Sequence, residues 1–488
     1  MKKFVLGIIL AAAGLVAVLQ LRASRLPPVP EAALRPDSLA LDAEAAGRHL
    51  AEAITFPTVS LESGGPVDTA AFRQLHLFLE RAYPNLHRQL RRELIGGLSL
   101  LFTWPGRDPA LAPVILMAHQ DVVPVTPEAL DRWAHPPFAG QIADGFIWGR
   151  GALDDKAGMM GILEAVEALL SQGYQPARTI YLAFGHDEEV GGVYGARAIA
   201  DTLMARGMAS PAMVLDEGGA MSEGMAGLEG PVALIGVAEK GFVTLQLTVD
   251  AEGGHSSMPP RETAIGILSA AITRLEAHPF PARMTPAVQG MFASMAPATS
   301  GATRLALANL WLFKPVVIRR LLAEPQTASM LRTTTAPTIF HAGVKDNVLP
   351  QRATASVNFR LLTGDTRESV MATVHRIIAD DRVRVNESLG MDPSPVSRTS
   401  GAAFDQLVGS IRETAAGRYP VVPFLVMGGT DAKYYAAASD RVYRFMPWRL
   451  GKGDLERVHG TDERLAVSAF ADGIRFYARL IRNADALP

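Results

Sequence analysis

Three short apolar segments, each typical of a buried strand, constrain this sequence more than any other feature. They cover residues 113–117, 179–184 and 213–215. Acidic or histidine side chains follow each of them, namely His119 and Asp121, Glu188 and Glu189, and Asp216. Helical patterns alternate with the segments, which predicts an α/β fold with a mainly parallel central sheet and helices on both faces. Because parallel strands end at one edge of a sheet, the polar side chains are expected to converge in one crevice.

A further acidic pair and a further histidine also lie in turns. Asp154 and Asp155 belong to a glycine-rich segment, residues 145–158, directly before a helical pattern. Acidic residues in that position are often only helix caps or dipole partners. His459 lies in a turn that also carries glycine and acidic residues. The residues that together combine imidazole with carboxylate are His119, Asp154, Glu189, Asp216 and His459.

Imidazole and carboxylate ligands without thiolate suit zinc. One bridging carboxylate can serve two ions roughly 3.5–4 Å apart, as in two-metal hydrolytic sites. Glu188 and Glu189 can then divide their roles, one as a metal ligand and the other as a general base. Asp121, two residues beyond His119, can hold the other ring nitrogen of that histidine.

The composition excludes several classes of protein. The chain contains no cysteine, so disulfides, thiolate zinc sites and cysteine nucleophiles are absent. A formal net charge of -2 gives no electrostatic reason to expect a nucleic-acid partner. A length of 488 residues exceeds one ordinary hydrophobic core and predicts two or three domains.

The N-terminus has the pattern of a signal peptide or a membrane anchor. Lys2 and Lys3 precede an apolar run, residues 4–19, and Arg22 and Arg25 follow it. No small-residue cleavage pattern follows the run, so we favour an uncleaved anchor in the membrane. Either way the body of the protein is expected outside the cytoplasm, membrane-anchored and facing the periplasm, or secreted.

The order of patterns along the chain predicts a second, inserted domain. Strand and helix patterns after about residue 240 follow the order βαββαβ, and the earlier alternation resumes after about residue 398. An apolar, methionine-rich stretch in this region could bind a greasy ligand or be ordinary helical core. The expected division is 1–21 signal peptide or anchor, 22–40 linker, 41–238 first segment of the catalytic domain, 239–392 lid with an apolar insertion at about 284–330, and 393–488 second segment of the catalytic domain.

The ordered set of motifs resembles the M20 family of dinuclear zinc peptidases, which includes aminoacylase, glutamate carboxypeptidase and carboxypeptidase S. Within that family the chain is most similar to the branch of carboxypeptidase S and the N-fatty-acyl amino acid synthase/hydrolases. The resemblance covers nearly everything after the linker. The matching segments are 117–124, 149–156, 185–189, 216–219, 254–257, 332–336, 358–360 and 457–460.

This resemblance implies two Zn²⁺ ions per subunit, with Co²⁺ or Mn²⁺ as substitutes. It implies a first ion on His119, Asp154 and Asp216, and a second on Asp154, Glu189 and His459. Glu188 would be the general base and Asp121 the partner of His119. The implied fold is a catalytic domain of the zinc-peptidase type, interrupted by a ferredoxin-like lid.

The resemblance also implies roles for residues outside the metal set. His255 would complete an oxyanion hole, and in dimeric members it comes from the partner subunit, so a homodimer through the lid is expected. Four further residues match positions that hold the free carboxylate of the substrate: Asn347, Arg360, Gly429 and Thr430.

The expected function is zinc-dependent hydrolysis of an amide next to a free α-carboxylate, in an N-acyl amino acid or a small peptide. Two versions stay open, an N-fatty-acyl amino acid hydrolase/synthase and a strict dipeptide carboxypeptidase. The alternative from another class is a catalytically inactive binding or receptor module on the same fold. That alternative is disfavoured because all five implied ligands and Glu188 are present.

Overall fold

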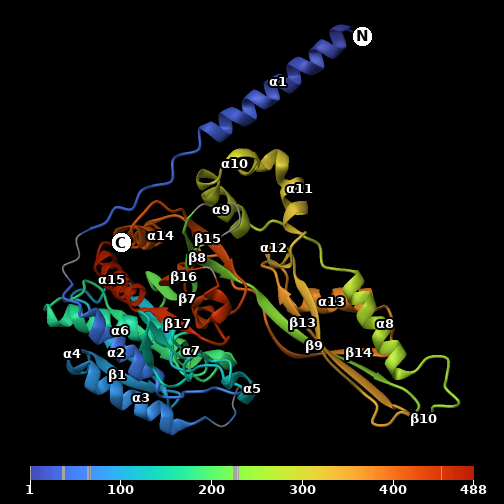
Figure 1. The fold of residues 1–488 in the computed structure, drawn as a ribbon, viewed down its shortest axis with the longest axis horizontal. Coiled ribbons are helices and arrows are strands. Elements are labelled where there is room, and N and C mark those ends of the chain that lie inside the picture. Colours follow the sequence, from blue (N-terminus) through green and yellow to red (C-terminus); the bar gives the residue numbers. More distant parts are fainter. Residues whose placement is uncertain are drawn as a thin grey trace.

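The larger body of the protein is built around an eight-stranded sheet (Figure 1). The computed structural model describes residues 2–35, 39–62, 65, 67–223, 228, 230–451 and 453–488. The strands of this sheet, in spatial order, are β1 (Arg91–Ile95), β2 (Ser99–Trp104), β6 (Ile180–Gly185), β3 (Val114–His119), β7 (Met213–Ser222), β16 (Val442–Leu450), β8 (Val232–Glu239) and β15 (Val421–Val426). The centre, β6 to β16, is parallel, whereas β1/β2, β2/β6 and β16/β8 pair antiparallel.

Helices cover both faces of this sheet, and β3 shows why. All six of its residues are buried, as expected for a central strand that is covered on both sides. Side chains alternate along a strand, so Leu116 joins one apolar core and Ile115 joins the other. One core includes α2 (Ala43–Ile54), α3 (Thr69–Ala82), α4 (Pro84–Gln89), α6 (Lys156–Ser171), α14 (Ala402–Thr414) and α15 (Val467–Ala484), and the other includes α7 (Ala196–Ala205).

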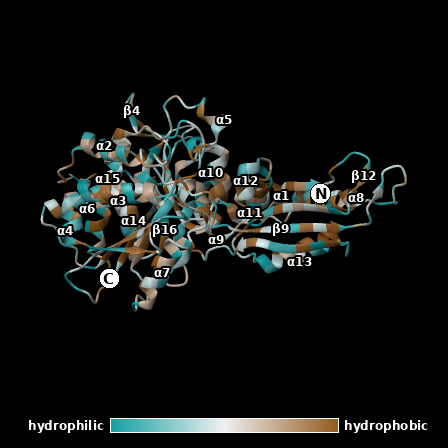
Figure 2. Cartoon of the chain, turned by 90° about the horizontal axis from the view of Figure 1, so that it is seen from below, coloured by the Kyte–Doolittle hydropathy of each residue, from teal (hydrophilic) through white to brown (hydrophobic). Residues whose placement is uncertain are grey.

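A four-stranded antiparallel sheet with two helices forms a second body, which we call the lid. Its strands, in spatial order, are β11 (Thr334–Ala342), β13 (Arg352–Leu361), β9 (Gly241–Asp250) and β14 (Val383–Met391). The helices α8 (Ala264–Ala277) and α13 (Arg367–Ile378) pack on it and share its apolar core. This is the expected βαββαβ order, and Figure 2 shows the lid projecting to one side of the large sheet. The predicted fold class is confirmed.

The lid ends in a small two-stranded sheet. Strands β10 (Gly254–His255) and β12 (Val348–Leu349) pair antiparallel there. We call residues 251–258 and 343–351 the tip. The tip lies at the end of the lid that is remote from the large sheet (Figure 1).

The apolar insertion consists of four α-helices and one short 3-10 helix: α9 (Pro286–Met295), η2 (Ala296–Ala298), α10 (Gly301–Ala308), α11 (Leu310–Leu321) and α12 (Pro325–Ser329). Helix α9 packs on β15, the edge strand of the large sheet, and its buried Met291 and Phe292 share a core with Val422 and Leu425 of that strand. The insertion therefore packs with the large sheet, although in the sequence it lies between two elements of the lid, α8 and β11.

The N-terminal helix α1 (Lys2–Ser24) projects away from the rest of the molecule, and only its last turns contact α10 (Figure 1). The stretch Lys3–Ser24, 22 residues long, is apolar and long enough to cross a membrane. Three residues of the expected linker, 36–38, lie outside the described residues. Other short elements are α5 (Pro127–Leu130), η4 (Leu455–Arg457) and a three-stranded sheet of β17 (Arg464–Ala466), β5 (Phe146–Trp148) and β4 (Gln141–Ala143).

Candidate metal centre

Two histidines and three carboxylates lie together at the carboxyl end of the parallel strands. His119 Nε2 is 2.8 Å from Asp154 Oδ1 and 3.9 Å from Glu217 Oε1. His459 Nε2 is 3.1 Å from Asp154 Oδ2 and 3.2 Å from Glu189 Oε2. Asp154 thus turns one oxygen towards each histidine, which is the arrangement expected of a bridging carboxylate.

Asp216 does not join this group, and its neighbour Glu217 does. The carboxylate of Asp216 accepts a hydrogen bond of 2.6 Å from the backbone N–H of Ala432, in η3 (Asp431–Tyr435). Strand β7 does not end at Asp216 but continues to Ser222, and its pairing with β16 shifts register between Asp216 and Ala220, so Glu217 lies in an irregular part of the strand. In this arrangement Glu217 faces His119, and the backbone of Ala432 holds the carboxylate of Asp216. Of the two acids, Glu217 is the one that lies near His119, whereas Asp216 was the expected ligand.

Asp121 connects His119 to the two consecutive glutamates. The Nδ1 atom of His119 lies 2.9 Å from the backbone oxygen of Asp121 and 3.4 Å from its carboxylate. The same carboxylate accepts hydrogen bonds from the backbone N–H groups of Glu188, at 3.1 Å, and Glu189, at 3.2 Å. One fully buried side chain thereby sets the position of a histidine and of the turn η1 (Glu188–Val190).

Glu463, which the motif pattern did not single out, holds the loop that carries Asp154. Its Oε1 accepts hydrogen bonds from the backbone N–H groups of Gly151, Leu153 and Asp154, and its Oε2 accepts one of 2.5 Å from Arg150. Arg150 in turn donates to the backbone oxygens of His459 and Gly460. The buried Arg150–Glu463 pair therefore links two loops that carry candidate ligands.

The electrostatics of the group favour bound cations. Burial raises the pKa of Glu188 and of Glu217 well above the usual range. Burial opposes ionisation of Asp154 too, but hydrogen bonds with His119 and His459 lower its pKa. Among the described residues, the buried Oε1 of Glu189 has no hydrogen-bond partner.

Two sets of facing ligand atoms emerge from this geometry. The ligand atoms of His119, Asp154 and Glu189 lie within 4.8 Å of one another, as do those of His119, Glu188 and Glu217. A divalent ion would satisfy the crowded carboxylates and the unpaired oxygen of Glu189, so the residues fit a metal centre.

The substrate-side residues separate into two places. A cleft of about 780 Å³ between the large sheet and the lid is lined by Glu188, His459, Arg360 and Gly429. Thr430 is buried and directs its hydroxyl, at 2.5 Å, to Glu239. It contacts Glu239, a residue of the cleft wall, and does not itself line the cleft.

Lys433 is a cleft residue that the motif pattern missed. Burial lowers its pKa, but the nearby Asp431 and Glu188 carboxylates outweigh that effect and raise it, so Lys433 stays charged. Its position three residues after Thr430, in the same loop, was the available signal. Together with Lys240 and Arg360 it gives the cleft three cationic side chains.

His255 and Asn347 lie at the tip, not in the cleft. Both are exposed, and the backbone N–H of Ser256 donates to the oxygen of Asn347 at 3.2 Å. The His255 ring contacts Ser257 Oγ at 2.7 Å. Neither residue lines the cleft of its own chain.

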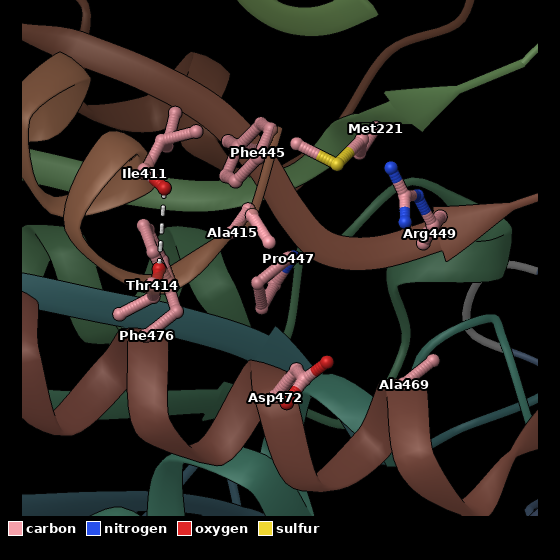
Figure 3. Close-up of a pocket in the computed structure, with 11 residues that line it drawn as sticks. Met221, Ile411, Thr414, Ala415, Phe445, Pro447, Arg449, Ala469, Asp472 and Phe476 are labelled. Carbon is pink, nitrogen blue, oxygen red and sulfur yellow. Dashed lines mark hydrogen bonds between the residues drawn. The ribbon is translucent and has the colours of Figure 1, made fainter. Parts of the chain in front are cut away.

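A second cavity, of about 110 Å³, lies between α14, α15 and β16 (Figure 3). Its wall is formed by apolar side chains such as Phe445 and Phe476, with Asp472 as its one acidic residue. It contains no histidine and shares no residue with the carboxylate–histidine group. His459 and Glu189 of that group therefore border the cleft and not this second cavity.

Comparison with known proteins agrees with this geometry. The sequence profile of Peptidase family M20/M25/M40 matches residues 115–483. The chain is 41% identical to the N-fatty-acyl-amino acid synthase/hydrolase PM20D1 of Xenopus tropicalis, covering 99% of this chain and 94% of that protein. It is 32% identical to carboxypeptidase S of Saccharomyces cerevisiae, covering 89% of this chain and 83% of that protein.

Solved structures show the same fold. The M20 family metallo-carboxypeptidase Sso-CP2 from Sulfolobus solfataricus superposes with a TM-score of 0.68 at 17% identity, covering 91% of this chain and 99% of that chain. Human carnosine dipeptidase 1 gives a TM-score of 0.63 at 16% identity, covering 91% and 97% of the two chains. The chain belongs to peptidase family M20. It is a metal-dependent hydrolase of amide bonds.

Proposed function

We propose that the protein hydrolyses the amide bond of N-fatty-acyl amino acids, next to the free α-carboxylate. The observation that carries this proposal is the shared cleft, in which Glu188 and His459 face the same space as Arg360 and Lys433. A substrate carboxylate held by the two cations leaves its amide beside the metal centre. The acyl component of the proposal rests on the relative from Xenopus tropicalis, which matches nearly the whole chain.

The proposed cofactor is a pair of Zn²⁺ ions, with Co²⁺ or Mn²⁺ as substitutes. We assign one ion to His119, Asp154 and Glu217, and the other to Asp154, Glu189 and His459. When bound, the ions polarise the amide carbonyl and acidify a water molecule.

The chain's own residues supply the proton transfers and the alignment. Glu188, which lines the cleft, takes a proton from the attacking water and delivers it to the leaving nitrogen. The carboxylate of Asp121 keeps Glu188 in place by accepting a hydrogen bond from the backbone N–H of Glu188. Arg360 and Lys433 hold the α-carboxylate, so that the amide is presented in one orientation.

Glu188→Gln tests the role of the base. We expect turnover of a long-chain N-acyl amino acid to fall at least a hundredfold, while zinc content by mass spectrometry stays at the wild-type level. Zinc loss in parallel with activity would instead make Glu188 a ligand. Full activity of the variant would refute the mechanism.

Glu217→Gln and Asp216→Asn test the ligand assignment as a matched pair. We expect Glu217→Gln to lose about one of two zinc ions per chain, because it removes a charged ligand. Asp216→Asn keeps an oxygen for the N–H of Ala432 and should retain both ions. The opposite pattern would restore Asp216 as the ligand.

The competing substrate class is the dipeptide, because carboxypeptidase S is also a relative. An acidic dipeptide and a long-chain N-acyl amino acid, assayed side by side, separate the two. We expect a higher kcat/KM for the acyl substrate, and loss of most of that rate when its α-carboxylate is replaced by a carboxamide. Faster cleavage of the dipeptide would favour a carboxypeptidase.

We propose a homodimer in which the tip of one chain reaches the cleft of the other. The support is the exposure of His255 and Asn347 at the tip, away from their own cleft. Mixing inactive His255→Ala with inactive Glu188→Gln chains should restore up to about a quarter of wild-type activity, since one site of a mixed dimer has intact cleft and tip. No recovery after verified subunit exchange would exclude this arrangement.

We further propose that α1 is an uncleaved anchor and that the catalytic body lies outside the cytoplasm. The support is its 22-residue apolar stretch, which at ~1.5 Å per residue spans about 33 Å, enough to cross a hydrocarbon core of ~30 Å. The full chain should stay in membranes after carbonate extraction and keep Lys2 and Lys3. Recovery of a shortened soluble chain would indicate a cleaved signal instead.

A further inference from the structure

The helices of the insertion are joined to the end of α1 by buried polar contacts. The side-chain amide of Asn309, fully buried between α10 and α11, donates to the backbone oxygen of Leu19 at 3.1 Å. Arg304 of α10 donates to the oxygen of Ala23 at 3.0 Å. Leu19 and Ala23 are themselves buried, in contrast to the exposed apolar residues before them. The α10–α11 corner is therefore tied to a defined depth along α1.

That depth falls at the boundary of a bilayer. From Lys3 to Leu19 a helix extends roughly 25 Å at ~1.5 Å per residue. A hydrocarbon core of ~30 Å is about 5 Å longer than this, so Leu19 lies within about one helical turn of the point where acyl chains meet headgroups. Because Asn309 contacts Leu19 directly, the start of α11 lies at the same level.

Helix α11 presents a face that suits this level. Its exposed residues recur in adjacent pairs every turn, which places them along one side: Trp311, Leu312, Pro315, Val316, Arg319 and Arg320. The first two turns of that side are apolar, and Trp311 and Val316 are 59% and 64% exposed. The opposite side, with Val317 and Ile318, packs on the apolar core beneath. Among the described residues, none covers this outward face.

The charge of the insertion points to anionic headgroups. Residues 284–330 contain four basic residues, Arg304, Lys314, Arg319 and Arg320, and one acidic residue, Glu324. Arg22 and Arg25 add two exposed cations at the end of α1. Tryptophan followed by arginine is the composition of helices that lie in the membrane interface, with the apolar residues at the acyl boundary and the cations among phosphates.

We propose that the outward face of α11 docks into the headgroup–acyl boundary of the bilayer that holds α1. The inference rests on the proposed membrane anchor and extends it, because a single helix would leave the catalytic body free to swivel. With α11 as a second attachment, the insertion and the large sheet that it packs on are held in one orientation to the membrane.

Trp311 provides its own probe, because the other four tryptophans are at most 9% exposed and lie in the core. The full chain is reconstituted into phosphatidylcholine vesicles with 30% phosphatidylglycerol, with and without brominated acyl chains. We expect brominated lipid to quench emission by at least a third. Trp311→Phe should abolish most of this quenching, and aqueous acrylamide should quench Trp311 weakly.

A matched control uses Leu94→Trp in the Trp311→Phe background. Leu94 is 52% exposed on β1, at the opposite end of the molecule from α11 (Figure 1). That tryptophan should be quenched by acrylamide and not by brominated lipid.

Three results would overturn the docking. Acrylamide quenching of Trp311 without lipid quenching would place α11 in water, and resistance to both would mean that protein, such as a second copy of the chain, covers the face. Failure of the chain to float with vesicles would refute both the proposed membrane anchor and the docking of α11. Flotation with a water-exposed Trp311 would refute the docking alone.

Discussion

Replacing Glu463 with glutamine should destabilise the catalytic domain around the large sheet by about 3–5 kcal/mol, the usual cost of removing one partner from a buried ion pair. Arg150 is 3% exposed and Glu463 is fully buried. The variant keeps one acceptor oxygen for the N–H groups of Gly151, Leu153 and Asp154. It loses the charge opposite Arg150 and places an amide N–H₂ against the guanidinium, so the destabilisation comes from the uncompensated cation.

Urea denaturation followed by circular dichroism measures this change, and zinc content provides a second readout because the pair joins the Asp154 and His459 loops. Glu31→Gln is the matched control. Its pair with Arg418 has a distance of 3.0 Å, but the two side chains are 69% and 66% exposed, so a loss below about 1 kcal/mol is expected. A second variant, Arg150→Met with Glu463→Gln, should be more stable than Glu463→Gln alone. A loss below about 1 kcal/mol for Glu463→Gln, no larger than that of an exposed pair, would refute the reasoning.

Two further predictions concern stability. Glu164, hydrogen-bonded at 2.6 Å, raises the pKa of His49, so this contact stabilises fully below about pH 6.5 and its contribution disappears as pH rises through the higher folded pKa. Glu164→Gln should flatten the pH dependence of the denaturation midpoint above about pH 6.5. An unchanged pH dependence would contradict this. Gly473→Ala should cost about 1–3 kcal/mol, because its Cβ would lie 1.9 Å from the buried Trp448 ring. Gly409→Ala, with open space around it, should gain up to about 1 kcal/mol, and equal effects in thermal denaturation would refute the packing argument.

The convergence of His119 and Glu189 could be predicted because it depends on a local rule. Each follows an apolar segment, and the structure places both segments as neighbouring parallel strands, β3 and β6. Parallel neighbours end at the same edge, so sequence order alone brings these side chains together. The fold class follows from the same alternation of strands and helices.

Glu217 and Glu463 were not found, for two different reasons. Choosing between Asp216 and Glu217 requires knowing where β7 ends and which of its faces meets His119, and hydrophobicity does not reveal either. Glu463 contacts Arg150 across 313 residues of sequence. No local pattern distinguishes such a buried carboxylate from an exposed one in a turn.

The insertion shows how one apolar composition can serve two purposes. From the sequence, its methionine and aromatic residues fit either a greasy binding surface or ordinary core. The structure separates the two by helix: Met291 and Phe292 of α9 are buried against β15, whereas Trp311 and Val316 of α11 face outward. The two helices share this apolar composition, and α9 is the one that packs on the edge strand β15. The outward residues lie beside the end of α1, and a surface of that kind requires a membrane or a partner to cover it.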